Sequence, residues 1–174
     1  LFPATLEEIC DESFIFTPGL KTVKFQPNSN LKKMINAFNN SKIESISLPA
    51  SVQYIDDDCF SFTPNLFKLE VQEGNKFFKS INGDYIITES VKNSGVLDAI
   101  LIARRNIESI TIPAYIKVIN NFSFQRCKNL KNIVFESNSS LEVIQSYAFC
   151  SISCEKIVFP PSLKELSSRS LFGN

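Results

Sequence analysis

The side chains that could carry out chemistry are few in this sequence of 174 residues. No histidine is present, so the most common proton carrier and metal ligand is missing. The one acidic run, Asp56-Asp57-Asp58, lacks the alternating ligands and the central glycine of a calcium loop. We therefore interpret this run as a solvated turn, with weak cation binding as the alternative.

The cysteines do not form a metal or disulfide framework of their own. Their odd number excludes complete pairing within one chain, and no C-x-x-C spacing occurs. Free cysteine is among the most buried residue types, so we expect most of these thiols in the core. Cys150 and Cys154 are close enough in sequence for a disulfide, and the sequence leaves open whether it forms. The five are Cys10, Cys59, Cys127, Cys150 and Cys154.

Catalytic and cofactor motifs are also absent. The chain has no G-x-S-x-G, no phosphate-binding glycine loop and no histidine beside a cysteine, and it holds only five glycines. We predict that it is not an enzyme and needs no cofactor or metal. Eighteen basic residues balance eighteen acidic ones, so no net charge favours nucleic acid. No apolar run is long enough to span a membrane, and the first residues lack a signal peptide's pattern.

The sequence repeats itself at a short period. "IESISLPASVQYIDDDCF" begins at Ile43, and "IESITIPAYIKVINNFSF" begins at Ile107. In each unit, apolar residues follow three and five positions after the opening one, which places both on one face of a short strand. The six units open at Leu20, Ile43, Leu66, Ile107, Leu130 and Cys154.

The second half of each unit has its own pattern. An aliphatic residue is followed three positions later by another, and five positions after that by Phe14, Phe60, Phe124, Phe149 or Leu171. The second unit is one residue short, with Phe38 four positions after Met34, so we expect a local rearrangement there. One coil cannot bury its own apolar face, but stacked coils can, and the recurring Phe residues would form a spine.

These residues resemble a known repeat. "IESISLPASVQYIDDDCFSFTPNL" and "IESITIPAYIKVINNFSFQRCKNL" look like the 23-residue leucine-rich repeat of the BspA-like proteins, and the second matches it to Cys127. The resemblance covers nearly the whole chain. It implies a surface or secreted protein, since family members occur on bacteria and parasitic protists, where several are thought to mediate adhesion to host cells, matrix or other microbes.

One unit is interrupted within residues 74–106. Two apolar runs, "DYIIT" and "VLDAILIA", flank a turn signal at Asn93-Ser94-Gly95, which predicts an inserted β-hairpin. The hairpin is either another way to build one coil or a projection that contributes to binding. Arg104 and Arg105 follow it and are weak indicators of an anion site.

The candidate binding surface follows from strand alternation. Where Ile46 and Leu48 point inward, Ser45 and Ser47 point outward, and the same holds in the other units. This face is either an ordinary solvated sheet or a flat polar site for protein or glycan. The predicted outward residues are Thr22, Lys24, Gln26, Ser45, Ser47, Lys68, Glu70, Gln72, Ser109, Thr111, Asn132, Val134, Glu136, Lys156 and Val158.

Three glycosylation sequons begin at Asn39, Asn121 and Asn138. In a protein secreted from a eukaryotic cell they could carry glycans, although Asn121 lies beside the predicted Phe spine and is the most hindered.

We therefore predict one right-handed leucine-rich-repeat solenoid over residues 1–174. It is β-rich, with short parallel strands on the concave face and loops or short helical turns on the convex face. The predicted function is a non-enzymatic binding module of a cell-surface or secreted protein, with a protein or glycan ligand on host cells or matrix. The alternative is a scaffold that only spaces other domains. Both ends cut through a repeat, so we also expect a risk of end-to-end self-association.

Overall fold

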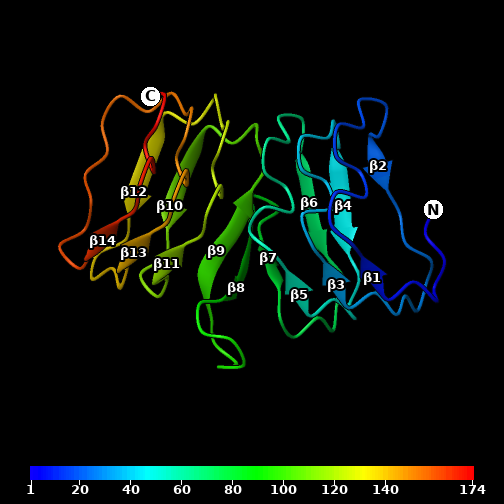
Figure 1. The fold of residues 1–174 in the computed structure, drawn as a ribbon. Helices are drawn as coiled ribbons and strands as arrows, with labels where there is room; N and C mark the ends of the chain where they lie inside the picture. The colour runs from blue at the N-terminus through cyan, green and yellow to red at the C-terminus, as the bar shows by residue number, and fades with distance from the viewer.

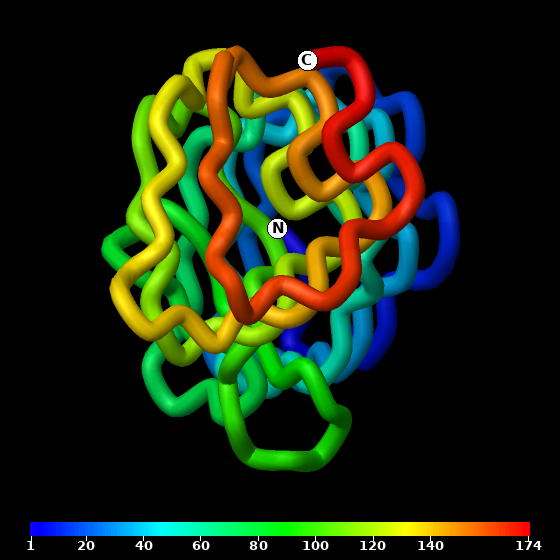
Figure 2. Tube along the Cα trace, turned by 90° about the vertical axis from the view of Figure 1, so that its left-hand side faces the viewer, coloured from blue at the N-terminus to red at the C-terminus, as the bar shows by residue number.

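Each repeat unit folds into one coil that contributes two short strands to the structure. The computed structural model describes residues 1–174 and contains no helix. Its coils stack into a β-solenoid of about seven turns (Figures 1 and 2). The first half of a unit forms what we call an opening strand: β2 (Thr22–Val23), β4 (Ser45–Leu48), β6 (Lys68–Val71), β10 (Ser109–Ile112) and β12 (Asn132–Phe135).

The second half of a unit forms a closing strand. These are β1 (Glu8–Ile9), β3 (Lys33–Met34), β5 (Tyr54–Ile55), β11 (Val118–Ile119), β13 (Val143–Ile144) and β14 (Glu165–Leu166). Equivalent residues of successive units pair in parallel: Thr22 with Ser45, and Ser45 with Lys68. The 23-residue period is therefore the length of one coil.

The closing strands correct one expectation. We predicted parallel strands on the concave face and loops or short helical turns on the convex face, but not the closing strands, which form further parallel sheets of their own. In β1, β3 and β5 an exposed residue precedes a buried aliphatic one. Two residues are too short a window for alternation to identify a strand from sequence, because the pairing comes from the neighbouring coil.

The recurring Phe residues stack along the solenoid. Phe38 lies 5.3 Å from Phe14 and 5.7 Å from Phe60 between ring centroids, with nearly parallel planes. Phe124 and Phe149 stack at 5.0 Å in the C-terminal half. The short loop of the second unit does not displace Phe38, whose amide donates to the next coil as the amide of Phe14 does. Asn36, two positions before Phe38, has a positive φ of 42°, as Phe122 and Tyr147 have two positions before their own spine residues.

The interruption lies in the middle of the array. β7 (Lys79–Ile81) pairs antiparallel with β8 (Tyr85–Glu89), which pairs antiparallel with β9 (Leu97–Ala103). The turn between β8 and β9 projects beyond the coils (Figure 1). Asn93 and Gly95 in this turn have φ values of 63° and 73°, a left-handed geometry that glycine and asparagine tolerate.

β9 belongs to the array as well as to the hairpin. Ala99 and Ile100 pair in parallel with Val118 and Ile119, so β9 takes the place of a closing strand. No Phe loop follows β9 in the fourth coil. In the other coils the amide of the spine Phe donates to a carbonyl of the next coil, and here the amide of Ala103 makes the equivalent hydrogen bond, to Ser123 O.

The hairpin divides both sheets and the core. The opening strands form one sheet of β2-β4-β6 and another of β10-β12, and the closing strands separate between β5 and the hairpin. Two core clusters of 19 and 18 buried residues lie on either side. Ile86 and Ile102 belong to the first cluster, whereas Ile87 and Ile100 belong to the second. The hairpin therefore forms a wall with both faces buried.

Candidate functional site

The outward residues of the opening strands are at the surface, but they do not form one continuous sheet. All fifteen predicted side chains are exposed or partly exposed. Those from Thr22 to Gln72 lie on or beside the β2-β4-β6 sheet, and those from Ser109 to Glu136 lie on or beside the β10-β12 sheet. Lys156 and Val158 lie in a segment without strand geometry, so the last coil does not extend the second sheet.

Some of these residues already have partners within the chain. The Gln26 side chain accepts a hydrogen bond from Ala4 N at 3.0 Å, and Glu136 accepts one from Ala114 N at 2.9 Å. Both residues follow an opening strand, and each binds a backbone amide of the preceding coil. Lys68 forms an ion pair with Glu70 at 2.9 Å on its own strand. The serines and threonines of the face remain its least committed polar groups.

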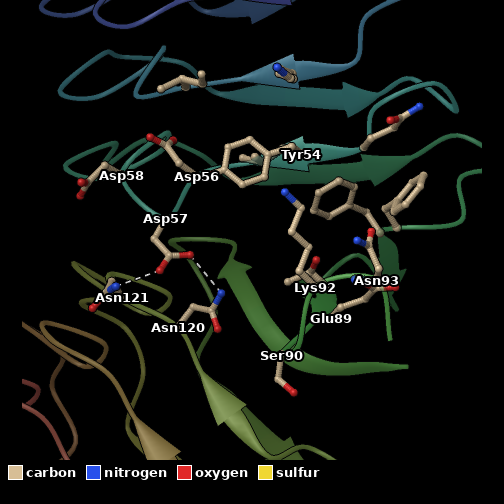
Figure 3. Close-up of a pocket in the computed structure, with 17 residues that line it drawn as sticks. Tyr54, Asp56, Asp57, Asp58, Glu89, Ser90, Lys92, Asn93, Asn120 and Asn121 are labelled. Carbon is tan, nitrogen blue, oxygen red and sulfur yellow. Dashed lines mark hydrogen bonds between the residues drawn. The ribbon is translucent and has the colours of Figure 1, made fainter. Parts of the chain in front are cut away.

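A cleft lies where the closing-strand sheet is interrupted. Its volume is about 770 Å³, within the range of roughly 300–1,000 Å³ typical of ligand sites. Tyr54 of β5 and Glu89 at the end of β8 lie on different sides of it (Figure 3). Their neighbours Ile55 and Thr88 also line it. Phe77 and Phe78 contribute apolar surface.

The acidic run lines this cleft and is more than a solvated turn. Asp57 accepts hydrogen bonds from Asn120 at 3.0 Å and from Asn121 at 2.8 Å, which connect the two halves of the solenoid (Figure 3). Asp56 accepts one from Asn36 N at 2.8 Å. Burial raises the pKa of Asp57, and the two asparagine bonds oppose that rise. Burial also raises the pKa of Asp56 and of Asp58.

The two arginines after the hairpin are structural and do not form an anion site. Arg104 pairs with Asp84 at 2.8 Å. Arg105 is 3% exposed, and its guanidinium donates to Phe60 O at 3.1 Å and Ser123 O at 3.0 Å. Arg105 therefore connects the loop of Phe60 to the loop of Phe124, which lie on either side of the fourth coil, where the Phe loop is missing. Burial lowers its pKa.

A second row of aromatic side chains reaches the surface, and the sequence reasoning missed it. Phe62, Phe122, Tyr147 and Phe172 follow one another at centroid distances of 6.3, 5.3 and 6.5 Å. Phe62 is 36% exposed and Phe172 is 61% exposed. The signal was available, because Phe122 and Tyr147 each lie two positions before a spine Phe.

Arginines cover part of this row. The Arg126 guanidinium lies 5.3 Å from the Phe62 ring centroid, and that of Arg169 lies 5.8 Å from the Tyr147 ring. Both distances fit cation–π contacts. The hydrogen bond from Arg169 to the Tyr147 hydroxyl raises the pKa of Arg169. We call Phe62, Phe122, Tyr147 and Phe172 with their two arginines the aromatic–arginine row.

The sequons differ in access. The Asn121 amide nitrogen is bound to Asp57, and its partner Ser123 is fully buried. Asn39 is partly buried and donates to Asn36 at 3.0 Å. Asn138 is exposed in a turn with a φ of 59°. Of the three, Asn138 is the exposed one.

The five cysteines are free thiols in the structure, including Cys150 and Cys154. Cys59, Cys127 and Cys150 are buried, and burial raises the pKa of Cys59 and of Cys127. No group of three or more cysteine, aspartate or glutamate side chains is arranged to hold a metal ion. The structure contains no helix that is long and apolar enough to cross a membrane.

The stacked coils with their repeated apolar positions define a leucine-rich-repeat solenoid. The sequence matches the BspA type leucine rich repeat region in six copies, over residues 1–94 and 98–174. Because the match covers nearly all of the chain, the chain belongs to the BspA type leucine-rich repeat family. No curated protein sequence matches it.

Solved structures share this fold. The pneumococcal vaccine antigen PcpA is similar with a TM-score of 0.84 and 30% identity, over 93% of this chain and 39% of that one. A leucine-rich cell surface protein from Faecalibacterium prausnitzii gives 0.82 and 19%, over 95% and 42%. A leucine-rich repeat protein from Eubacterium ventriosum gives 0.52 and 16%, over 98% and 75%. The chain thus spans about two fifths of the first two.

Proposed function

We propose that this chain is a non-enzymatic binding module of a cell-surface or secreted protein, and that it adheres to a protein on host cells or matrix. Its family membership supports the location, as does its structural similarity to the leucine-rich cell surface protein from Faecalibacterium prausnitzii. The adhesive role comes from the family resemblance. The aromatic–arginine row is the observation that carries the proposal.

The row has the composition of a protein-binding surface. Aromatic residues and arginine are enriched among the residues that dominate binding energy, and contiguous exposed apolar surface commonly marks an interaction site. Phe122 and Tyr147 stack, Phe62 and Phe172 lie against them in tilted and edge-on contacts, and the arginines lie over two of the rings. Because these contacts already restrain the side chains, little side-chain entropy remains to be lost on binding. The opening-strand face offers hydroxyls and mixed charges instead, and we keep it as a second candidate surface for protein or glycan.

A binding assay on epithelial cells separates these surfaces. In the row variant, Arg126 and Arg169 are both changed to Glu; in the control, Lys24 and Lys156 on the opening-strand face are both changed to Glu. The two variants reverse equal numbers of charges. We expect saturable binding of the native chain, retained in the control and reduced about tenfold or more in the row variant.

The other results identify the alternatives. Loss in the Lys24 and Lys156 variant alone would place the site on the opening-strand face. No saturable binding by any of the three proteins would favour a solenoid that spaces other domains and has no ligand of its own. Light scattering of the native chain tests the proposed end-to-end association, and mass spectrometry of secreted material tests glycosylation at Asn138.

A further inference from the structure

Strand β5 has an edge without a neighbour. Along β3, the carbonyls of Lys32 and Met34 accept hydrogen bonds from Tyr54 N at 3.1 Å and from Asp56 N at 3.2 Å. The corresponding carbonyls along β5 are those of Gln53, just before the strand, and Ile55. They accept no hydrogen bond from the chain, because β5 pairs with β3 alone. The carbonyls of β11 are satisfied by β13 in the way that those of β3 are by β5.

The hairpin is the reason for this free edge. β9 pairs with β11 on one side and with β8 on the other, so it turns no edge toward β5. β7 pairs with β8 only as far as Ile87, which leaves Thr88 and Glu89 unpaired on that side. The cleft therefore lies between the free edge of β5 and the end of β8 (Figure 3). Phe77 and Phe78 are among the residues that line it.

The spacing of the free acceptors suits a strand. Gln53 and Ile55 are two residues apart, so their carbonyls point the same way about 6.6 Å apart along β5. Alternate amides of an extended peptide have the same separation. Proteins commonly bind peptides by adding a strand to an exposed sheet edge in this way.

The charges around the cleft indicate the side chains of such a peptide. Four carboxylates line it, from Asp56, Asp57, Asp58 and Glu89, against the two ammonium groups of Lys33 and Lys92. Asp58 is exposed at the surface of the cleft. A lysine or arginine would gain from this excess of negative charge, and an acidic peptide would be repelled.

We propose that this cleft binds an extended, lysine- or arginine-bearing segment of a partner protein as an added strand on β5. The segment's alternate amides donate to the carbonyls of Gln53 and Ile55, and its basic side chain lies against the acidic run at Asp56–Asp58. This surface is distinct from the aromatic–arginine row, and the inference does not require adhesion to cells.

The test uses the whole chain and labelled peptides of eight residues. One peptide alternates threonine with lysine, and its counterpart alternates threonine with glutamate. We expect fluorescence polarisation to show saturable binding of the lysine peptide and at least about tenfold weaker binding of the glutamate peptide. Asp58→Lys should weaken the lysine peptide about tenfold, while Glu155→Lys, an equal charge change at an exposed site outside the cleft, should leave it unchanged.

N-methylated peptides test the strand geometry itself. Methyl groups on every second amide remove the donors of one edge of the peptide, and methylation of the other set removes those of the opposite edge. Strand addition predicts that one set abolishes binding and the other preserves it. Equal binding of both sets, equal binding of the acidic peptide, an equal loss in Glu155→Lys, or no binding of the lysine peptide at millimolar concentration would each overturn the proposal. No cells are used, so this result stands apart from the adhesion assay.

Discussion

At the scale of single residues, the unusual side chains of this protein gather where the repeat is broken. Arg105 and Asp57 both make contacts across the interruption, the first to Phe loop carbonyls and the second to asparagines of the coil beyond the hairpin. Neither role could be predicted from the sequence. Arg105 follows another arginine, and Asp57 lies within an acidic run, and both patterns are typical of exposed residues. A sequence does not show whether a charged residue is buried or solvated.

Arg105 should be a major stabilising residue. Replacing it with alanine leaves a void between the two Phe loops and removes the hydrogen bonds to Phe60 and Ser123. We expect Arg105→Ala to lower the free energy of unfolding by about 2–4 kcal/mol in urea titrations. Arg104→Ala is the matched control, since its partly exposed ion pair with Asp84 should contribute about 0.2–1 kcal/mol. Equal losses in the two variants would contradict the bridging role.

Asp57 and Asp98 should give stability profiles of opposite sign. Burial raises the folded-state pKa of Asp57 above its usual 3.8, so its contribution is greatest below that value and is lost as pH rises through the folded pKa. Burial also acts on Asp98, but bonds from Ser90 and Lys117 outweigh it and lower the pKa. Its contribution is present above 3.8 and is lost as pH falls.

Urea titrations between pH 3 and 7 would measure these profiles. Relative to the native chain, Asp57→Asn should become more stable as pH rises from about 4. Asp98→Asn should instead become less stable relative to the native chain as pH rises through the lower part of the range. The Asp57→Asn profile also reports on Asp56, because the charge of Asp57 raises the pKa of Asp56. Parallel profiles for the two variants would show that the assigned pKa directions are wrong.

At the scale of the coil, the repeat period predicted the fold well. The opening strands and the buried Phe positions follow from the apolar spacing, as at Ile46, Leu48 and Phe60. The closing strands, the free edge of β5 and the cleft did not follow from it. Each depends on which strand of the next coil lies beside a given strand. The insertion removes the neighbour of β5, but the residue types at Gln53 and Ile55 do not indicate this.

The Phe spine should dominate the stability of a coil. Phe38 is fully buried between two stacked rings, so Phe38→Ala should cost about 3–5 kcal/mol. Phe16 is 67% exposed, and Phe16→Ala should change the free energy of unfolding by less than about 0.5 kcal/mol. Chemical denaturation measures both values. A small loss at Phe38 would mean that the spine relaxes around the gap.

At the scale of the whole molecule, two core clusters are joined by one hairpin with both faces buried. Residues of β8 and β9 alternate between the clusters, as Ile86 and Ile87 do. The sequence predicted a hairpin within one solenoid. It could not show that the two core clusters share this hairpin, because a continuous apolar run does not indicate which side of the strand each residue faces.

The shared wall predicts cooperative unfolding. Since neither cluster keeps its full set of contacts without β8 and β9, we expect one thermal transition, with coincident curves from circular dichroism and tyrosine fluorescence. Ile86→Ala should lower the midpoint without splitting the curve. Two resolved transitions would show that the halves on either side of the hairpin fold independently.

The central claim is that this solenoid binds a protein at a cell surface. The most direct measurement is the binding isotherm of the labelled native chain on intact epithelial cells, before and after trypsin removes exposed cell-surface proteins. The account predicts saturable binding that is lost after trypsin treatment. Binding that never saturates, or saturable binding that trypsin leaves unchanged, would contradict a protein ligand.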